Sequence, residues 1–146
     1  MRIRTPRRHA ATAVETALVL LPLIVVSCGI FEYGRLLMHW NLLNNAAREG
    51  CRYALVNNTD PTINADVQAV VNRFMAGQSS DFTNFNVTVT GTHQGVATPV
   101  NNLVAGDTIT VTVTGKFQFM DVVPLVRTPA SVTLTSAVVM ICEGAT

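Results

Sequence analysis

Hydrophobic positions follow three successive patterns along the chain. From Ala10 to Phe31 almost every residue is apolar, in a run of 22 residues. From there to Val56 apolar residues recur every three or four positions, which is typical of an amphipathic helix. After Asn57 a short helical stretch gives way to alternation of apolar and polar residues. The first pattern predicts a membrane-spanning helix, because as a helix it is about 33 Å long and the hydrocarbon core of a bilayer is about 30 Å thick.

The first two patterns together predict one unbroken helix over residues 11–56, a transmembrane segment that continues as a stalk. Pro22 lies inside the apolar run, where membrane helices tolerate proline. His39 has no second metal ligand at helical spacing, so we expect it to be a polar surface residue. The stalk carries a stripe of residues at helical spacing: Tyr33, Leu37, Trp40, Leu43 or Asn44, Ala47, Cys51 and Ala54. We expect Tyr33 and Trp40 to be interfacial or packing aromatics, and the small residues of Ala47–Ala54 to pack on the periplasmic domain.

Residues 57–146 predict a small domain after the long helix. The turn-forming residues Asn57–Pro61 end that helix. A short helix should follow, beginning at Pro61 or Ala65 and ending at Ala76, just before a glycine.

Alternation with threonine predicts the strands of this domain. Apolar and polar residues alternate in segments 85–90, 108–114 and 132–135, and the last continues into an apolar run. Such β-branched alternation is typical of half-buried strands. Residues 91–107 should form a long surface connection, residues 116–120 extend the second strand, and Pro124 and Pro129 bound the loop before the last strand. Three antiparallel strands against one or two helices form a minimal core, so the predicted fold class is α+β.

Basic residues are concentrated at the N-terminus. The first ten residues contain Arg2, Arg4, Arg7 and Arg8 and no acid, which leaves six basic and nine acidic side chains for the rest of the chain. Because arginines hold their side of a membrane helix in the cytoplasm, we expect a single-pass protein of a bacterial inner membrane with a cytoplasmic N-terminus and a periplasmic domain. The net charge of +1 argues against nucleic acid as a partner.

Glu15 is an acidic residue inside the apolar run. An acid costs about 2.5 to 3.5 kcal/mol at the centre of a membrane helix and less near the interface. Ionisable residues in membrane segments are by default functional and have a partner. No basic residue follows Glu15 at helical spacing, so the partner must come from a neighbouring chain or from a new N-terminus.

Two blocks of sequence carry a resemblance to a known family. Arg7–Leu23 combines arginines, small residues, an Ala-Val-Glu sequence and a Leu/Val-rich run with a proline, and Asn45–Ala54 reads NAAREGCRYA. Together they resemble the TadE-like pseudopilins of the tight-adherence (Flp) pilus system, which are relatives of type IV pilins. The resemblance implies a minor pseudopilin that assists assembly or priming of such a pilus, with pilin or other pseudopilin subunits as partners.

The resemblance also implies processing by a prepilin peptidase, which makes a glutamate the fifth residue of the mature chain. Counting back from Glu15 places the cut between Ala10 and Ala11. Cleavage would remove the basic leader, residues 1–10, and create an α-amino group at Ala11. Glu15 of one chain could neutralise that amine on its neighbour, since charge pairing is strong in a low-dielectric setting.

Two other interpretations of the N-terminal segment stay open. The chain could remain unprocessed, as a membrane-anchored periplasmic binding module. Alternatively, Val25–Cys28 loosely resembles a lipobox, which would make the protein a lipoprotein anchored at Cys28.

The cysteines and the missing motifs complete the sequence picture. Cys51 and Cys142 both fall in the predicted periplasmic part, where an oxidising environment favours a disulfide between them. The sequence contains no HExxH, GxSxG, P-loop or CxxC motif. We therefore expect no enzymatic activity, cofactor or metal, and no small-molecule substrate.

Overall fold

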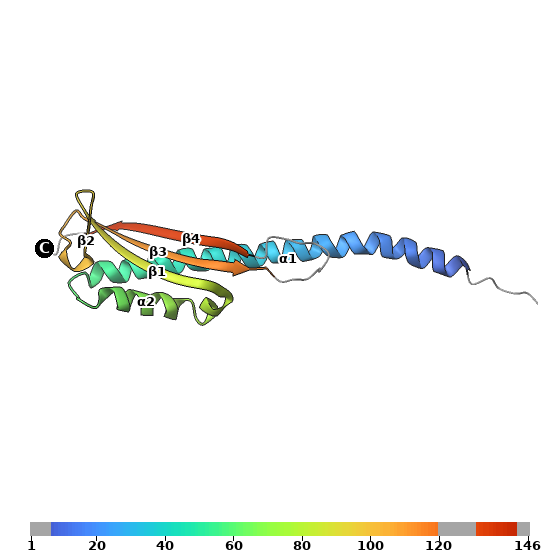
Figure 1. The fold of residues 1–146 in the computed structure, drawn as a ribbon, viewed down its shortest axis with the longest axis horizontal. Coiled ribbons are helices and arrows are strands. Elements are labelled where there is room, and N and C mark those ends of the chain that lie inside the picture. The colour runs from blue at the N-terminus through green and yellow to red at the C-terminus, as the bar shows by residue number, and fades with distance from the viewer. Residues whose placement is uncertain (1–6, 120–130, 143–146) are drawn as a thin grey trace, which may run out of the picture.

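A single helix, α1 (Arg7–Val56), runs through most of the length of the molecule (Figure 1). The computed structural model describes residues 7–119 and 131–142, with side chains from residue 11 onward. Helix α1 has 50 residues and continues through Pro22 without interruption. The predicted unbroken helix is therefore confirmed, although it begins at Arg7 rather than Ala11.

The rest of the described chain forms a four-stranded antiparallel sheet and one further α-helix. The elements after α1 are α2 (Ile63–Phe74), the 3-10 turn η1 (Gln78–Asp81), β1 (Phe82–His93), β2 (Val96–Thr98), the 3-10 turn η2 (Val100–Asn102), β3 (Thr108–Gln118) and β4 (Ser131–Ile141). The strands lie in the order β2-β1-β3-β4, and every neighbouring pair is antiparallel. The predicted α+β class is confirmed.

Helices α1 and α2 cover the sheet. Helix α1 packs against β3, β4 and α2, and α2 in turn contacts β1. Figure 1 shows the second half of α1 running alongside the strands, while its first half projects away from them. The part of α1 that was expected to be a stalk thus lies largely against the sheet and α2.

Alternation along β3 explains the core of this sheet. Ile109, Val111, Val113 and Phe117 are fully buried, and the threonines between them lie on the other face. Gly115 completes the buried row, and a Cβ there would lie 2.7 Å from the Phe82 ring, so only glycine leaves room for that ring on β1.

Small residues of the Asn45–Ala54 block let α1 approach the sheet and α2 closely. A Cβ on Gly50 would lie 2.7 Å from Cγ2 of Val71 and 3.2 Å from Cγ1 of Val67, both on α2. Arg48, Glu49 and Arg52 lie on the exposed side. The buried members of this small-residue face are Ala46, Ala47, Gly50, Cys51 and Ala54.

The stripe at helical spacing on α1 is buried only in its second part. Leu43, Ala47, Cys51 and Ala54 are buried, and the small residues among them pack on the domain as expected. Tyr33, Leu37 and Trp40 are exposed, so the two aromatics do not pack against the described part of the domain. At this level of α1 the domain contacts another side of the helix, through His39. Hydrophobic spacing identifies the apolar face of a helix, but it does not give the length over which the domain covers that face.

The predicted short elements differ from the observed ones at their ends. Helix α2 runs from Ile63 to Phe74, inside the range predicted for it. Strand β2 and turn η2 occupy part of residues 91–107, which were expected to be a surface connection. Strand β2 was missed because it has only three residues, which pair with β1 across a turn whose Gln94 and Gly95 have positive φ. The loop predicted around Pro124 and Pro129 and the end of the 116–120 extension lie outside the described residues.

Candidate functional site

The first half of α1 is a candidate membrane span. Within the part of the chain described, α1 is long and apolar enough from Ala11 onward to cross a membrane, with a most apolar window of mean hydropathy 2.3 that is not buried by the protein. Large apolar side chains point outward all around this half: Val14, Leu18, Val19, Leu20, Leu21, Leu23, Ile24, Val26, Ile30 and Phe31. Because nothing among residues 7–119 and 131–142 covers these side chains, this half is suited to an apolar environment outside the chain.

Polar groups within this half are mostly satisfied by the helix itself. The hydroxyls of Thr16 and Ser27 each donate a hydrogen bond of 2.8 Å to the carbonyl oxygen four residues earlier. Such bonds remove the cost of placing a hydroxyl in lipid. Glu15 is different, because it is an exposed carboxyl group on the apolar half of the helix.

The predicted leader residues lie at the start of this helix. Arg7, Arg8 and Ala10 belong to α1, and Arg2 and Arg4 lie outside the described residues. The Ala10–Ala11 bond is therefore a helical peptide bond four residues before Glu15. Its cleavage, and the roles of the arginines and of Glu15, remain predictions.

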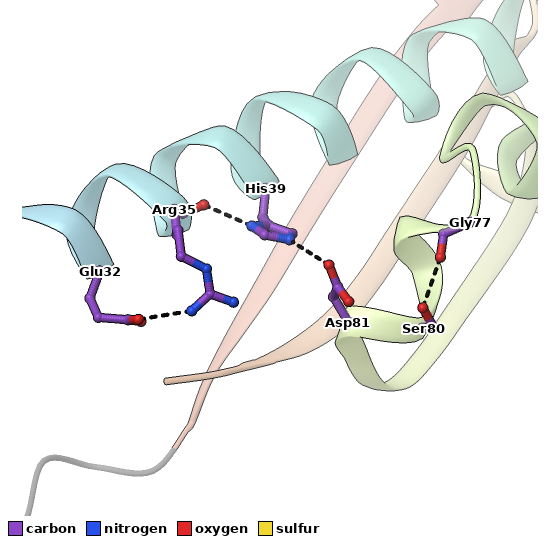
Figure 2. Close-up of polar contacts among 6 residues, drawn as sticks. All are labelled: Glu32, Arg35, His39, Gly77, Ser80 and Asp81. Atoms are coloured by element: carbon purple, nitrogen blue, oxygen red, sulfur yellow. Dashed lines mark hydrogen bonds and ion pairs between the residues drawn. The ribbon is translucent and has the colours of Figure 1, made fainter. Parts of the chain in front are cut away.

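A polar cluster lies where α1 meets the domain (Figure 2). Arg35 donates a 2.8 Å hydrogen bond from Nη1 to Glu32 Oε1, and both side chains are partly buried. The Arg35 guanidinium lies 5.3 Å from the centre of the Phe117 ring, in position for a cation–π contact. Glu32 Oε2 is buried and finds no hydrogen-bond partner among the described residues.

His39 is the centre of this cluster, and the prediction that it lies on the surface was wrong. Its side chain is 2% exposed. Nδ1 lies 2.8 Å from the carbonyl oxygen of Arg35, which can only accept, so Nδ1 donates. Nε2 lies 3.3 Å from Oδ2 of Asp81 and donates to it when the ring is protonated. The imidazole therefore links α1 to the turn that precedes β1.

Aromatic rings enclose the imidazole and exclude water from it. Its centre lies 5.3 Å from that of Phe82, edge to face, and 5.0 Å from that of Phe117. The turn η1 presents Asp81 from the other side, and Figure 2 shows Ser80 Oγ bonded to the carbonyl oxygen of Gly77 at 2.8 Å across that turn. No local sequence signal could have identified this pair, because His39 and Asp81 are 42 positions apart.

Cys51 and Cys142 lie in the domain core as free thiols. Both are buried, and the structure contains no bond between them. Sγ of Cys51 lies 3.6 Å from the carbonyl oxygen of Ile109 on β3 and 3.7 Å from that of Val138 on β4. Burial raises the pKa of the Cys142 thiol, and the negative charge of Asp107 adds to this effect. The disulfide under oxidising conditions remains a prediction.

A second polar pair, missed by the sequence analysis, lies at the far end of the domain. His93 Nδ1 is 2.6 Å from Oδ1 of Asp107, while Oδ2 of that carboxylate accepts a 2.8 Å hydrogen bond from the amide of Val104. The bond from Val104 and the contact with His93 lower the pKa of Asp107. Hydrogen bonds in both directions between the backbones of residues 106–107 and Cys142 join this turn to the end of β4. The pair stabilises this turn at the end of β4.

In comparisons with known proteins, the N-terminal segment matches one family model. Residues 10–52 match the family model described as TadE-like protein. The match confirms the resemblance to TadE-like proteins. It spans the apolar half of α1 from residue 10, the polar cluster around His39 and the small-residue face except Ala54. No curated protein and no solved structure matches the chain. Within the described residues, no group of three or more His, Cys, Asp or Glu side chains could hold a metal ion.

Proposed function

We propose that the protein is a minor pseudopilin that assists assembly or priming of a tight-adherence (Flp-type) pilus. The observation that carries this proposal is that the TadE-like segment, residues 10–52, coincides with the exposed apolar half of α1 and its entry into the domain. A TadE-like protein with a candidate membrane span belongs with the membrane and with pilus assembly components. We further propose that the N-terminus lies in the cytoplasm and the domain in the periplasm, because the basic leader precedes the span.

In this role α1 acts by packing and charge pairing, without catalysis. A prepilin peptidase cuts between Ala10 and Ala11 and removes four arginines with the leader. The new amine and Glu15 are opposite charges in a low-dielectric environment, where an unpaired charge is costly. Pairing between Glu15 of one subunit and the amine of its neighbour therefore favours correctly aligned helices over other arrangements.

Substitution of Glu15 tests this mechanism. We expect Glu15→Gln to leave membrane insertion intact, since it removes a charge from an apolar helix, but to reduce co-purification with the pilin subunits of the same system. Glu49→Gln is the matched control, because Glu49 is an exposed glutamate on the domain half of the same helix. Co-purification of Glu15→Gln at the level of the unchanged protein would contradict the proposed pairing.

The N-terminus of the mature protein distinguishes the proposal from its alternatives. Purification from membranes followed by intact-mass measurement and N-terminal sequencing should give a chain that begins at Ala11. A chain beginning at Met1 would identify an unprocessed membrane-anchored binding module. A lipid on Cys28 would identify a lipoprotein.

A further inference from the structure

An exposed apolar surface continues beyond the apolar run of α1 and alongside the start of the domain. It consists of Tyr33, Leu37, Met38 and Trp40, whose exposed fractions are 61%, 38%, 52% and 48%. We call these four residues the collar surface. They face away from the domain, although the domain contacts the same helical turns through His39.

Charges at this level of the helix are turned away from the solvent or paired. Glu32 and Arg35 form an ion pair with side chains 12% and 26% exposed, and His39 is buried. Residues 32–40 contain no other ionisable side chain except the phenol of Tyr33. Arg48 and Glu49 are the first exposed charged residues that follow on the helix. The outward side of α1 is therefore apolar or aromatic from the span up to Trp40.

The length of this apolar surface fits a bilayer together with one of its interfaces. From Ala11 to Trp40 a helix rises about 45 Å. A bilayer is about 40–45 Å thick with its polar headgroup regions, of which about 30 Å is hydrocarbon. Tyrosine and tryptophan concentrate at the level of the headgroups, where a ring has both apolar and polar surroundings. Tyr33 and Trp40 lie on the helix where this interface is expected.

We propose that the collar surface is embedded in the headgroup and outer acyl region of the membrane, so that the domain rests directly on the lipid surface. This inference rests on the membrane anchoring in the proposed function. The end of the domain at η1 and Phe117 then lies at the headgroups, because His39 contacts both at the level of Trp40. The continuous apolar surface favours lipid as the occupant, since the same helical face is already exposed to lipid in the span.

Trp40 provides a direct probe, because it is the only tryptophan in the sequence. The full chain would be reconstituted into phosphatidylcholine vesicles in which the lipids carry bromine atoms at shallow or deep acyl positions. We expect Trp40 emission to be quenched more by shallow than by deep bromines and to be protected from aqueous iodide. A double variant, Trp40→Phe with Val56→Trp, moves the probe to an exposed site at the domain end of α1. Its emission should be quenched by aqueous iodide and not by brominated lipid.

Three results would overturn the inference, and they are distinguishable. If the protein floats with the vesicles but Trp40 is quenched by iodide and not by bromine, the chain is anchored and the collar surface is in water. If Trp40 is protected from both quenchers, a second copy or another protein covers the surface. If the protein does not float with vesicles at all, the membrane anchoring in the proposed function fails as well.

Discussion

The two halves of α1 have the same backbone geometry but opposite environments. Before residue 32 the helix carries large apolar side chains that are exposed, whereas from His39 to Ala54 it is packed against β3, β4 and α2. The side chains differ accordingly. Leucine, valine and isoleucine dominate the first half, and alanine, glycine and cysteine form the buried face of the second.

This difference reflects what two environments, lipid and a protein core, would require of one helix. Lipid adapts to any side-chain shape, so the first half needs only apolar surface of sufficient length. A protein neighbour is rigid and closely packed, so the second half needs small residues where backbones approach. The TadE-like match, residues 10–52, includes residues of both halves.

The largest difference in stability between the two halves is expected when a glycine in each is replaced by alanine. Gly50→Ala places a Cβ 2.7 Å from Cγ2 of Val71, so α1 and α2 must separate, and we expect a loss of about 1–3 kcal/mol in the free energy of unfolding. Gly29→Ala meets no atom within 4 Å and should be neutral or stabilising, because alanine favours helix. Denaturant unfolding in detergent followed by circular dichroism measures both. Equal effects would contradict the comparison.

Removal of a polar group from each half should also give unequal effects. His39→Leu keeps a bulky side chain but loses the bonds to Arg35 and Asp81, so we expect the domain to lose about 1–2 kcal/mol of stability. Glu15→Gln should leave the unfolding of the domain unchanged, because Glu15 is exposed outside it. The same unfolding assay applies. An unchanged stability of His39→Leu would show that the hydrogen bonds of His39 do not stabilise the domain.

Cysteine labelling compares the two halves without a mutation. In detergent, N-ethylmaleimide should modify Cys28 first, because it is only partly buried, while Cys51 and Cys142 should react only after unfolding. For Cys142 the raised pKa adds protection, since the thiolate is the reactive form. Peptide mass spectrometry reads out all three sites. Protein isolated from an oxidising compartment provides the further test, since free thiols at both Cys51 and Cys142 would reject the predicted disulfide.

The smallest effect on stability should come from protonation of Asp107, at the far end of the domain, when the pH is lowered. Because the folded-state pKa of Asp107 is lowered, its contribution to stability is present above its unfolded pKa, near 3.8, and is lost as the pH falls through the folded value. Asp107→Asn should therefore flatten the dependence of unfolding on pH in the acid range. His93→Ala should retain most of that dependence, since the amide of Val104 is the main cause of the shift. An unchanged acid profile in Asp107→Asn would contradict this assignment.

Local patterns explain why most of the fold could be predicted from the sequence. The apolar run and the helical spacing after it fix α1, and the alternation of Ile109, Val111 and Val113 with threonines fixes β3. Strand ends and the three-residue β2 were missed, because short pairings depend on a partner strand rather than on their own residues.

The polar junction could not be predicted, for a different reason. His39 looked like a surface residue because its partners, Asp81, Phe82 and Phe117, come from distant parts of the chain. The same argument applies to Tyr33 and Trp40, because their spacing alone could not decide between an interfacial and a packing role, and both side chains are exposed. In contrast, Glu15 and the Asn45–Ala54 block were recognisable as local signals, and the family match covers the first and nearly all of the second.

The absence of any break in α1 has a mechanical consequence. Since the described helix passes from the apolar half into the domain without a loop, the domain cannot change its orientation independently of the membrane segment. Val56 lies about 24 Å beyond Trp40 along the helix. A tilt of about 20°, common for membrane helices, would therefore swing that end sideways by about 8 Å. With the candidate span in a bilayer, as proposed above, a sideways force on the domain would therefore act as a torque on the membrane part of the helix.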